Sequence, residues 1–304
     1  MVTVGVASYN NALYLRETLE SIRLQTYPRV ELLIVDDASP DDSVTVAETW
    51  LAAHPEVNGR LIRHSTNLGV CRVCNDIVTQ AKGEFICIIG SDDAYLPDKL
   101  REQVSILESV DFSYGVVYSD VLYIDELGNI TGKTSIDKNH LVENAFDKLM
   151  VSNSIPAMGV LVRKSCYENV GIYDEDLVYE DADMWLRIAK EYKFVFSDYV
   201  SAKYRKHTYS TMYGRDNNVR YLESTILMLR KNLGFSNASD LVIKKYMADL
   251  AEKTYYAGGS KSTYWLKERW KSDKKMSSFV LLTMSRLKVP AKWVTKLQRL
   301  LGRR

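Results

Sequence analysis

Short apolar runs alternate with segments of helical periodicity along the first third of the chain. Residues 2–8, 30–36 and 85–89 are rich in β-branched and other apolar side chains, which is typical of buried strands. The spacing of apolar residues between them predicts helices and one short strand, at residues 15–24, 43–53, 60–63 and 69–81. Strands alternating with helices indicate parallel β-α-β units with right-handed crossovers. The predicted fold class is therefore α/β, with a mostly parallel, Rossmann-like central sheet flanked by helices.

Polar side chains stand where three of these strands end. Because the carboxyl ends of parallel strands meet at one edge of a sheet, and open α/β sheets bind ligands at that edge, we expect these side chains to line a single cleft. The group consists of Ser8, Asn10, Asp36, Asp37, Asp92 and Asp93.

The adjacent carboxylates Asp92 and Asp93 are the most informative members of this group. Burying two neighbouring carboxylates is costly unless a cation neutralises them. Their oxygens suit Mg²⁺ or Mn²⁺, which can in turn hold a diphosphate. A solvated turn, with an Asp capping the helix expected from Pro97 onward, is the alternative for this segment alone. The clusters at the other two strand ends favour an active site.

These residues resemble a family 2 glycosyltransferase with the GT-A fold. The resemblance covers about residues 1–210 and rests on nine pieces in the right order, which are Val6–Asn10, Ser21–Pro28, Val35–Ser39, Asn67–Val70 with Asn75, Ala81–Phe85, Ser91–Asp93 with Pro97–Leu100, Val117–Asp120, Glu180–Arg187 and Tyr204–His207.

The resemblance implies a nucleotide-sugar site in the first hundred residues. Asp37 matches the carboxylate that hydrogen-bonds the nucleobase, typically uracil. Many relatives carry an Arg just before the residue that matches Asn75; here Cys74 takes that position, and Arg72 is the nearest cation. The base and ribose would be surrounded by Ala7, Ser8 and Tyr9.

The resemblance also implies a metal and diphosphate site. Asp92 matches a residue near the donor ribose, and Asp93 matches a ligand of a divalent metal, Mn²⁺ or Mg²⁺. Ser91 stands where relatives often carry a further acid, which weakens the neutralisation of the metal's charge. Arg205 would bind phosphate as a fork, and His207 would bind phosphate or metal. A lone His is otherwise more often structural.

Glu180 and Asp181 resemble the catalytic acidic pair of the family, in which the Asp is the general base. An acceptor hydroxyl attacks the anomeric carbon while the nucleotide diphosphate departs from the opposite face, so the anomeric configuration is inverted. A carboxylate within hydrogen-bonding reach removes the hydroxyl proton, which contributes about 10²–10⁴ in rate. The same residues also fit a helix N-terminus that favours acids, with Met184, Trp185 and Ile188 as its buried stripe. The two interpretations are compatible.

The last part of the chain is strongly basic. From Lys261 onward it has thirteen Lys and Arg against two acids, a net charge of +11, whereas the whole chain carries +1. Apolar residues near the end share one helical face and cations another, which is typical of a helix on an anionic membrane. We expect residues 288–304 to bind such a surface; a helix packed on the catalytic domain with a solvated basic face is the alternative. No base-reading motif accompanies the charge, so nucleic acid is not an expected partner.

Composition favours a cytoplasmic protein, peripheral on the inner face of the cell membrane. The four cysteines, at positions 71, 74, 87 and 166, suggest a reducing compartment. No apolar run approaches the roughly 18 residues of a membrane span, and no signal peptide is evident.

The predicted organisation is a GT-A catalytic domain over residues 1–210 and a helical region with a basic amphipathic tail over 211–304. Within the catalytic domain, about 1–100 would bind the donor and 101–210 the acceptor. The predicted function is an inverting hexosyl- or N-acetylhexosaminyltransferase that moves a sugar from a UDP-sugar to a glycan or lipid-linked oligosaccharide, in synthesis of a bacterial-type surface polysaccharide such as lipopolysaccharide or capsule.

Two other function classes remain open. A nucleotide-sugar-binding scaffold without turnover would be expected to lose the base, yet Asp181 is present. A nucleotidyltransferase that makes the sugar donor usually carries a Gly-rich loop with Arg or Lys after its first strand, where this chain has Ser8-Tyr-Asn-Asn-Ala12.

Overall fold

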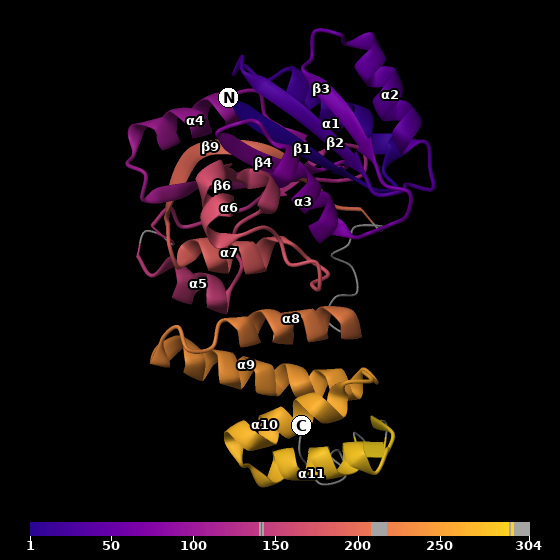
Figure 1. The fold of residues 1–304 in the computed structure, drawn as a ribbon, viewed down its shortest axis with the longest axis vertical. Helices are drawn as coiled ribbons and strands as arrows, with labels where there is room; N and C mark the ends of the chain where they lie inside the picture. Colours follow the sequence, from indigo (N-terminus) through magenta and orange to yellow (C-terminus); the bar gives the residue numbers. More distant parts are fainter. Residues whose placement is uncertain (140, 142, 208–217, 292, 295–304) are drawn as a thin grey trace. The chain divides into compact units, whose positions relative to one another are not determined.

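The computed structural model describes residues 1–139, 141, 143–207, 218–291 and 293–294. The chain divides into two compact units. One consists of residues 1–175 and 180–208, and the other of residues 176–179 and the chain from 209 onward (Figure 1). The boundary predicted at residue 210 falls in a segment outside the described residues, and the division into donor and acceptor halves stays a prediction.

The first unit is an α/β structure. Its elements follow one another as β1 (Val2–Ser8), α1 (Ala12–Arg23), β2 (Val30–Asp36), α2 (Ser43–Ala53), β3 (Gly59–Arg63), α3 (Val70–Gln80), β4 (Phe85–Gly90), β5 (Ala94–Tyr95), α4 (Lys99–Ser109), β6 (Tyr114–Ile124), β7 (Ile130–Lys133), α5 (Ala145–Val151), the 3₁₀ turn η1 (Ala157–Gly159), β8 (Leu161–Arg163), α6 (Lys164–Val170), α7 (Asp181–Ala189) and β9 (Lys193–Arg205).

The strands form one sheet in the order β3-β2-β1-β4-β8-β6-β9-β5, with β7 paired to β6. The pairs among β3, β2, β1 and β4 are parallel, as expected from the β-α-β pattern. Beyond β4 the sheet is mixed, because β8 is antiparallel to both β4 and β6, whereas β6 and β9 are parallel. The predicted α/β class is confirmed: the sheet is parallel from β3 to β4, and beyond β4 it combines the long parallel pair β6 and β9 with short antiparallel pairings.

The strand register brings the predicted polar ends together. Ser8 pairs with Asp36, and Ala7 pairs with Gly90, so β1, β2 and β4 end at the same level. The side chains that follow these strands therefore share one edge of the sheet, which is where ligands bind in open α/β folds.

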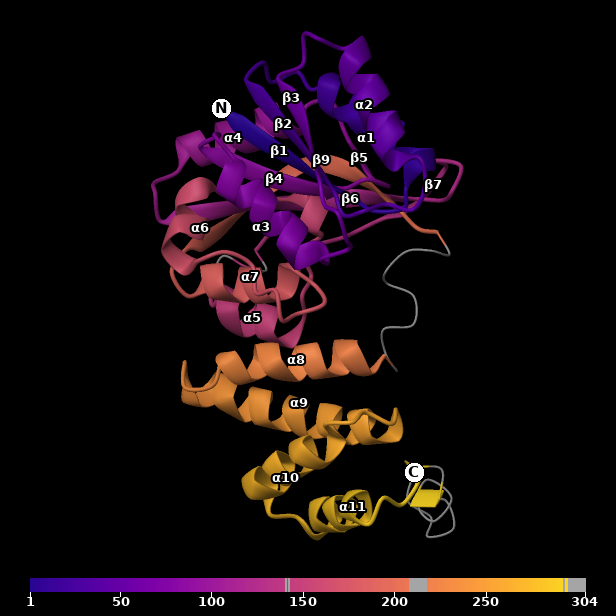
Figure 2. The same ribbon diagram turned by 45° about the vertical axis from the view of Figure 1, so that its right-hand side comes forward.

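Helices cover both faces of this sheet (Figures 1 and 2). Alternate apolar residues of β1, β2 and β4 pack with α1, α2 and α4 in one core. On the other face α3 approaches β1 closely, because a Cβ at Gly5 would lie 2.3 Å from Cγ2 of Ile77. Glycine at position 5 thus permits α3 to pack directly against the backbone of β1.

The second unit contains helices α8 (Val219–Lys231), α9 (Asn237–Tyr256), α10 (Ser262–Asp273) and α11 (Met276–Arg286). Ser236 begins α9 as its N-cap, and its hydroxyl accepts the N–H of Ser239 at 3.0 Å. Buried apolar residues on these helices include Ile226, Ile243, Leu250, Leu266 and Leu281. Among the described residues, no helix combines the length and the apolar character that crossing a membrane requires.

Candidate functional site

The loop after β4 carries the two predicted carboxylates, and the structure places them in different surroundings. The side chain of Asp92 is 19 % exposed, and its Oδ2 lies 2.9 Å from Nε2 of His207. Asp93 is buried, and its Oδ1 accepts a hydrogen bond of 2.8 Å from the backbone N–H of Arg205. Burial, and then the charge of Asp92, raise the pKa of Asp93 well above its usual value. Asp92 is therefore the accessible carboxylate of the pair.

The guanidinium of Arg205, at the end of β9, is committed to the protein itself. Only 2 % of its side chain is exposed. Its Nε donates to the carbonyl oxygen of Asp92 at 2.9 Å, and its Nη2 to the carboxylate of Glu17. Its Nη1 donates to the carbonyl oxygens of Asp125 and Glu126 at 3.1 and 3.3 Å. In this structure Arg205 thus holds the loop between β6 and β7 against the carboxylate loop, and its role as a phosphate fork stays a prediction.

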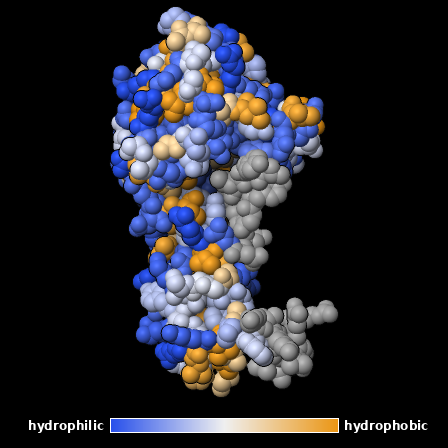
Figure 3. All heavy atoms as spheres, turned by 90° about the vertical axis from the view of Figure 1, so that its right-hand side faces the viewer, coloured by the Kyte–Doolittle hydropathy of each residue, from blue (hydrophilic) through white to orange (hydrophobic). Residues whose placement is uncertain are grey.

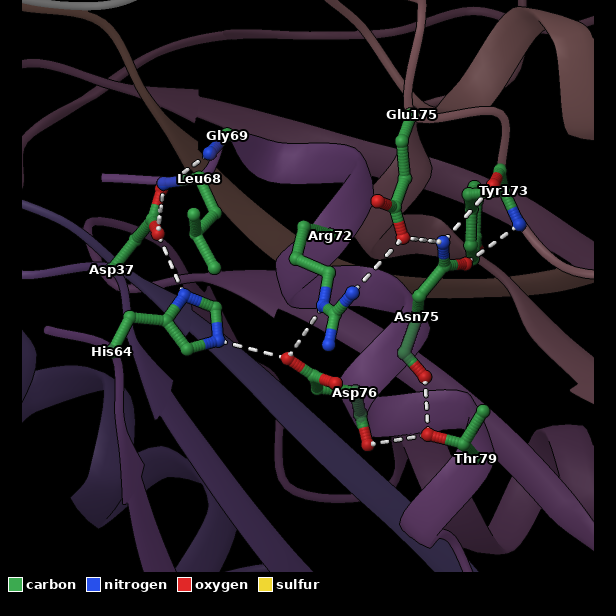
Figure 4. A network of polar contacts seen from close by, with 10 residues as sticks. All are labelled: Asp37, His64, Leu68, Gly69, Arg72, Asn75, Asp76, Thr79, Tyr173 and Glu175. Carbon is green, nitrogen blue, oxygen red and sulfur yellow. Dashed lines mark hydrogen bonds and ion pairs between the residues drawn. The ribbon is translucent and has the colours of Figure 1, made fainter. Parts of the chain in front are cut away.

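Asp37, immediately after β2, is also buried and hydrogen-bonded within the chain. Its Oδ1 accepts the N–H of Leu68 at 2.8 Å and lies 2.7 Å from Nδ1 of His64, while its Oδ2 accepts the N–H of Gly69 at 2.8 Å (Figure 4). Gly69 has a φ of +92°, a conformation that favours glycine. In this structure Asp37 thus anchors the start of α3, and its direct contact to a nucleobase stays a prediction.

Ser8 and Asp36 form the neighbouring part of the sheet edge. The Ser8 hydroxyl donates to Oδ2 of Asp36 at 2.9 Å, and Ser39 donates to the same carboxylate through its N–H and its hydroxyl. Tyr9 projects outward, 47 % exposed. An open pocket of about 430 Å³ lies beside this edge and is lined by Asp36, Ala38, Ser39, Val44, Arg63, His64 and Ser65.

The imidazole of His64 bridges two carboxylates. Its Nδ1 lies 2.7 Å from Asp37 and its Nε2 lies 2.8 Å from Oδ2 of Asp76 on α3 (Figure 4). Carboxylates are acceptors only, so both contacts are hydrogen bonds when both ring nitrogens carry protons. Burial lowers the pKa of His64, but hydrogen bonds to Asp37 and Asp76 outweigh it, and the pKa is raised above its usual value. When both ring nitrogens are protonated, the ring therefore fastens α3 to the end of β2 through two hydrogen bonds.

Helix α3 also grips the segment that leads to the predicted catalytic acids. The buried amide of Asn75 donates to the carbonyl of Tyr173 at 3.0 Å and to Glu175 at 2.8 Å, and it accepts the N–H of Tyr173 at 2.7 Å (Figure 4). Arg72, one turn earlier and 46 % exposed, pairs with Asp76 at 3.3 Å and with Glu175 at 3.8 Å. Arg72 is thus an accessible cation beside the site.

Helix α7 begins at Asp181, with Glu180 as its N-cap. Oδ1 of Asp181 accepts the N–H of Ala182 at 2.7 Å, and Oδ2 accepts the side-chain N–H of Asn153 at 2.8 Å. Asp183, the other acid of this turn, is buried and pairs with Arg187 at 2.9 Å. Sequence reasoning missed Asn153, because no motif surrounds it and the contact joins residues 28 positions apart.

Asp181 borders a small cavity that it shares with β4. The cavity has a volume of about 30 Å³, room for about one water molecule. Its lining includes Ile86, Cys87 and Ile88 of β4, Tyr173 from the segment held by Asn75, and Trp185 of α7. The predicted base thus lies beside the strand whose end carries Asp92.

The side chains of Asp92 and His207 are chemically suited to bind a divalent cation. A carboxylate oxygen and an imidazole nitrogen suit Mn²⁺, whereas Mg²⁺ favours oxygen ligands throughout. Within the described residues, no group of three or more His, Cys, Asp or Glu side chains is placed to hold a metal ion. An ion bound by this pair would therefore need further ligands from substrate or water. The metal role of Asp93 stays a prediction, and its neighbour Asp92 is the more accessible carboxylate for such an ion.

The sequence profile of Glycosyl transferase family 2 matches residues 3–168, more than half of the chain. The chain belongs to this family. The resemblance noted in the sequence is thereby confirmed.

Relatives named as glycosyltransferases match about two thirds of the chain. An uncharacterized glycosyltransferase of Methanocaldococcus jannaschii is 31 % identical over 210 residues, which are 67 % of this chain and 70 % of that protein. An uncharacterized glycosyltransferase of Rickettsia prowazekii is 26 % identical over 69 % of this chain, and the chain spans 65 % of its length. The putative glycosyltransferase EpsE of Bacillus subtilis is 29 % identical over 62 % of this chain and 67 % of its own length.

Solved structures share the fold of this family 2 member. TarS residues 1–349 of S. aureus, in complex with UDP-GlcNAc, has a TM-score of 0.66 at 16 % identity, covering 94 % of this chain and 92 % of that one. The mannosyltransferase PcManGT of Pyrobaculum calidifontis, in complex with GDP-Man and Mn²⁺, has a TM-score of 0.60 at 20 % identity, covering 98 % and 84 %. At these identities the likeness shows the fold alone.

Proposed function

We propose that this family 2 member transfers a sugar, with inversion, from a nucleotide diphosphate-sugar to a hydroxyl of a glycan or lipid-linked acceptor, in synthesis of a bacterial-type surface polysaccharide. The observation that carries the proposal is the contact between Asp92 and His207 at the carboxyl end of β4. It places an accessible carboxylate and an imidazole at the edge where open α/β sheets bind ligands. UDP is the proposed carrier, and it is the nucleotide named for the TarS complexes.

The donor lies along the carboxyl ends of β1, β2 and β4 in this proposal. Ala7, Ser8 and Tyr9 adjoin the base and ribose, and the exposed Tyr9 ring offers a stacking surface. Asp37 fixes the wall of the base site through the backbone N–H groups of Leu68 and Gly69. Arg72 is a cation accessible to the donor, because its guanidinium is half exposed.

Asp92 and His207 would hold a divalent metal, Mn²⁺ by the chemistry of the pair. The bound ion would neutralise charge on the departing diphosphate. Asp93 and Arg205 stabilise the position of this pair. The carboxylate of Asp93 accepts the backbone N–H of Arg205, two residues before His207. This hydrogen bond fixes the backbone that leads to His207 and so positions its imidazole beside Asp92.

Asp181 acts as the general base. The acceptor oxygen forms a bond to the anomeric carbon, the bond from that carbon to the diphosphate oxygen breaks, and the hydroxyl proton passes to the carboxylate of Asp181. The amide of Asn153 orients the carboxylate through its hydrogen bond to Oδ2. Inversion follows because attack and departure occur on opposite faces of the sugar.

A panel of donors tests the function. UDP-, GDP- and dTDP-sugars are offered to the full chain with Mn²⁺ or with chelator, and binding is followed by calorimetry and slow hydrolysis by release of the nucleotide diphosphate. We expect one UDP-sugar to bind in a metal-dependent way and to be hydrolysed, with hydrolysis lost in Asp181→Asn.

Three results would contradict the proposal. If no nucleotide sugar bound to the chain, the proposed donor site would be wrong. Tight binding without hydrolysis or transfer to any offered acceptor would indicate a scaffold. Formation of a nucleotide sugar from a triphosphate and a sugar phosphate would indicate a nucleotidyltransferase.

A further inference from the structure

Helix α11 of the second unit carries apolar residues on two opposite sides, one buried and one exposed. Its inner face, buried within the unit, consists of Ser278, Leu281, Leu282 and Ser285. At about 100° per residue, a second stripe of apolar residues lies on the opposite side. A surface helix normally carries polar residues there, so this outer stripe is not explained by the packing of the unit.

The outer stripe consists of Met276, Phe279 and Val280 of α11 together with Leu287, the C-cap residue of the helix. Their exposed fractions lie between 41 and 75 %. Phe279 and Val280 follow Met276 by three and four residues, and Leu287 follows Val280 by seven. At these spacings the side chains lie along one side of the helix. Figure 3 shows apolar side chains gathered at the lower end of the C-terminal helices. Large exposed apolar patches mark sites of interaction.

Cations flank both ends of this stripe. Lys274 and Lys275 precede Met276, and Arg286 and Lys288 stand on either side of Leu287. All four side chains are exposed. The chain has no Asp or Glu after Asp273. The surface therefore combines apolar residues with positive charge and carries no acid among them.

Trp270 of α10 extends the surface with an aromatic ring. Its ring centroid lies 5.8 Å from that of Phe279, and Nζ of Lys274 lies 4.6 Å from the ring centroid. Aromatic residues beside Lys and Arg at the edge of an apolar surface are typical of the membrane–water interface.

We propose that the outer face of α11, defined by Met276, Phe279, Val280 and Leu287 with the flanking cations, docks on an anionic phospholipid surface. Cations at both ends of the stripe would contact headgroups while the apolar side chains enter the boundary with the acyl chains. A second copy of the same face would bring like charges together, so self-association is disfavoured. This surface precedes most of the tail, residues 288–304, that the sequence indicated; much of that tail lies outside the described residues. The inference does not depend on the proposed glycosyl transfer.

Flotation of the full chain with vesicles tests the proposal. Vesicles of phosphatidylcholine alone are compared with vesicles containing one part phosphatidylglycerol in three, at low and at high salt. The apolar variant is Phe279→Ser with Val280→Ser, and the charge variant is Lys275→Gln with Arg286→Gln. Matched controls stand on α9, where Leu241→Ser with Val242→Ser and Lys244→Gln with Lys245→Gln change exposed residues of the same kinds.

We expect the unmodified chain to bind anionic vesicles at low salt, to bind neutral vesicles weakly, and to be released by salt. Each α11 variant should weaken binding by about tenfold or more, while both α9 controls bind as the unmodified chain does. Thermal melts should coincide, because every substituted side chain is exposed.

Four results would overturn the proposal. These are failure to bind anionic vesicles at low salt, binding unaffected by the α11 substitutions, equal loss in the α9 controls, or a dimer in size-exclusion chromatography that the apolar variant alone dissociates. The third would indicate a non-specific charge effect, and the last would assign the face to a second copy of the chain.

Discussion

Nε2 of His207 lies 2.9 Å from Oδ2 of Asp92, although the two residues are 115 positions apart in sequence. The contact depends on the path of β9, which pairs with β5 so that Lys203 stands opposite Ala94. Arg205 then fastens the end of β9 through its backbone N–H to Asp93 and through its side chain to the carbonyl of Asp92. The pair at the candidate metal site is thus built by the sheet and by a buried arginine.

The first prediction separates the roles of Asp92 and Asp93. Asp92→Ala should abolish the Mn²⁺-dependent part of UDP binding and change the free energy of unfolding by less than about 1 kcal/mol, because the side chain is partly exposed. Asp93→Ala should cost about 1–3 kcal/mol, because it leaves the buried N–H of Arg205 without its acceptor. Calorimetry with Mn²⁺ or chelator measures the first effect, and urea unfolding measures the second. Loss of metal dependence with unchanged stability in Asp93→Ala, but not in Asp92→Ala, would reverse the assignment.

The second prediction concerns the general base. Asp181→Asn keeps the shape of the side chain and removes the proton acceptor, so turnover should fall by at least about a hundredfold. Donor affinity should change little, because the substitution acts on the step after binding. Steady-state transfer and calorimetry on the same preparation check both statements. The neighbouring Glu180→Gln is the control, and a larger loss of turnover there than in Asp181→Asn would place the base elsewhere.

The third prediction tests Asn153 as a positioning residue. Its amide donates to Oδ2 of Asp181 and so orients the carboxylate. Asn153→Ala should lower kcat about tenfold while KM for the donor changes little, because one hydrogen bond to the base is lost after the donor has bound. The control Ser152→Ala changes the adjacent exposed residue and should leave kcat in place. An unchanged kcat in Asn153→Ala, or an equal loss in Ser152→Ala, would show that Asn153 has no such role.

The fourth prediction follows from the raised pKa of His64. Because the folded state holds the proton more tightly than the unfolded chain, the stabilisation is fully present below pH 6.5 and is lost as pH rises through the higher folded-state pKa. His64→Gln should therefore lower the free energy of unfolding by about 1–3 kcal/mol at pH 5.5 and by less at pH 9. Urea unfolding across this range measures the difference. A difference that stays constant or grows with pH would contradict a charged His64.

Sequence alone determined the α/β class and the common edge of three strands. Apolar runs of five to seven residues and the helical spacing between them are local patterns, and the right-handed crossover leaves the carboxyl ends of such strands on one edge. The ends of β1, β2 and β4, with Ser8 opposite Asp36, lie where the pattern requires. The family followed from these strand ends together with the other short motifs that match it in the same order.

Only the tertiary structure decided which polar side chains remain available to bind a ligand. Arg205 had the chemistry of a phosphate ligand, but buried donors must find acceptors, and the carbonyls of Asp92, Asp125 and Glu126 meet it inside the protein. Asp37 was likewise drawn to the backbone of the loop before α3.

Three further features could not be predicted from the sequence: the antiparallel pairing of β8, the contact between Asn153 and Asp181, and the outward apolar face of α11. Each depends on which segments pack together at long range. The sequence shows which residues are apolar or charged and which of them share a face of a helix or strand. Long-range packing decides whether each of these residues is buried, paired or exposed.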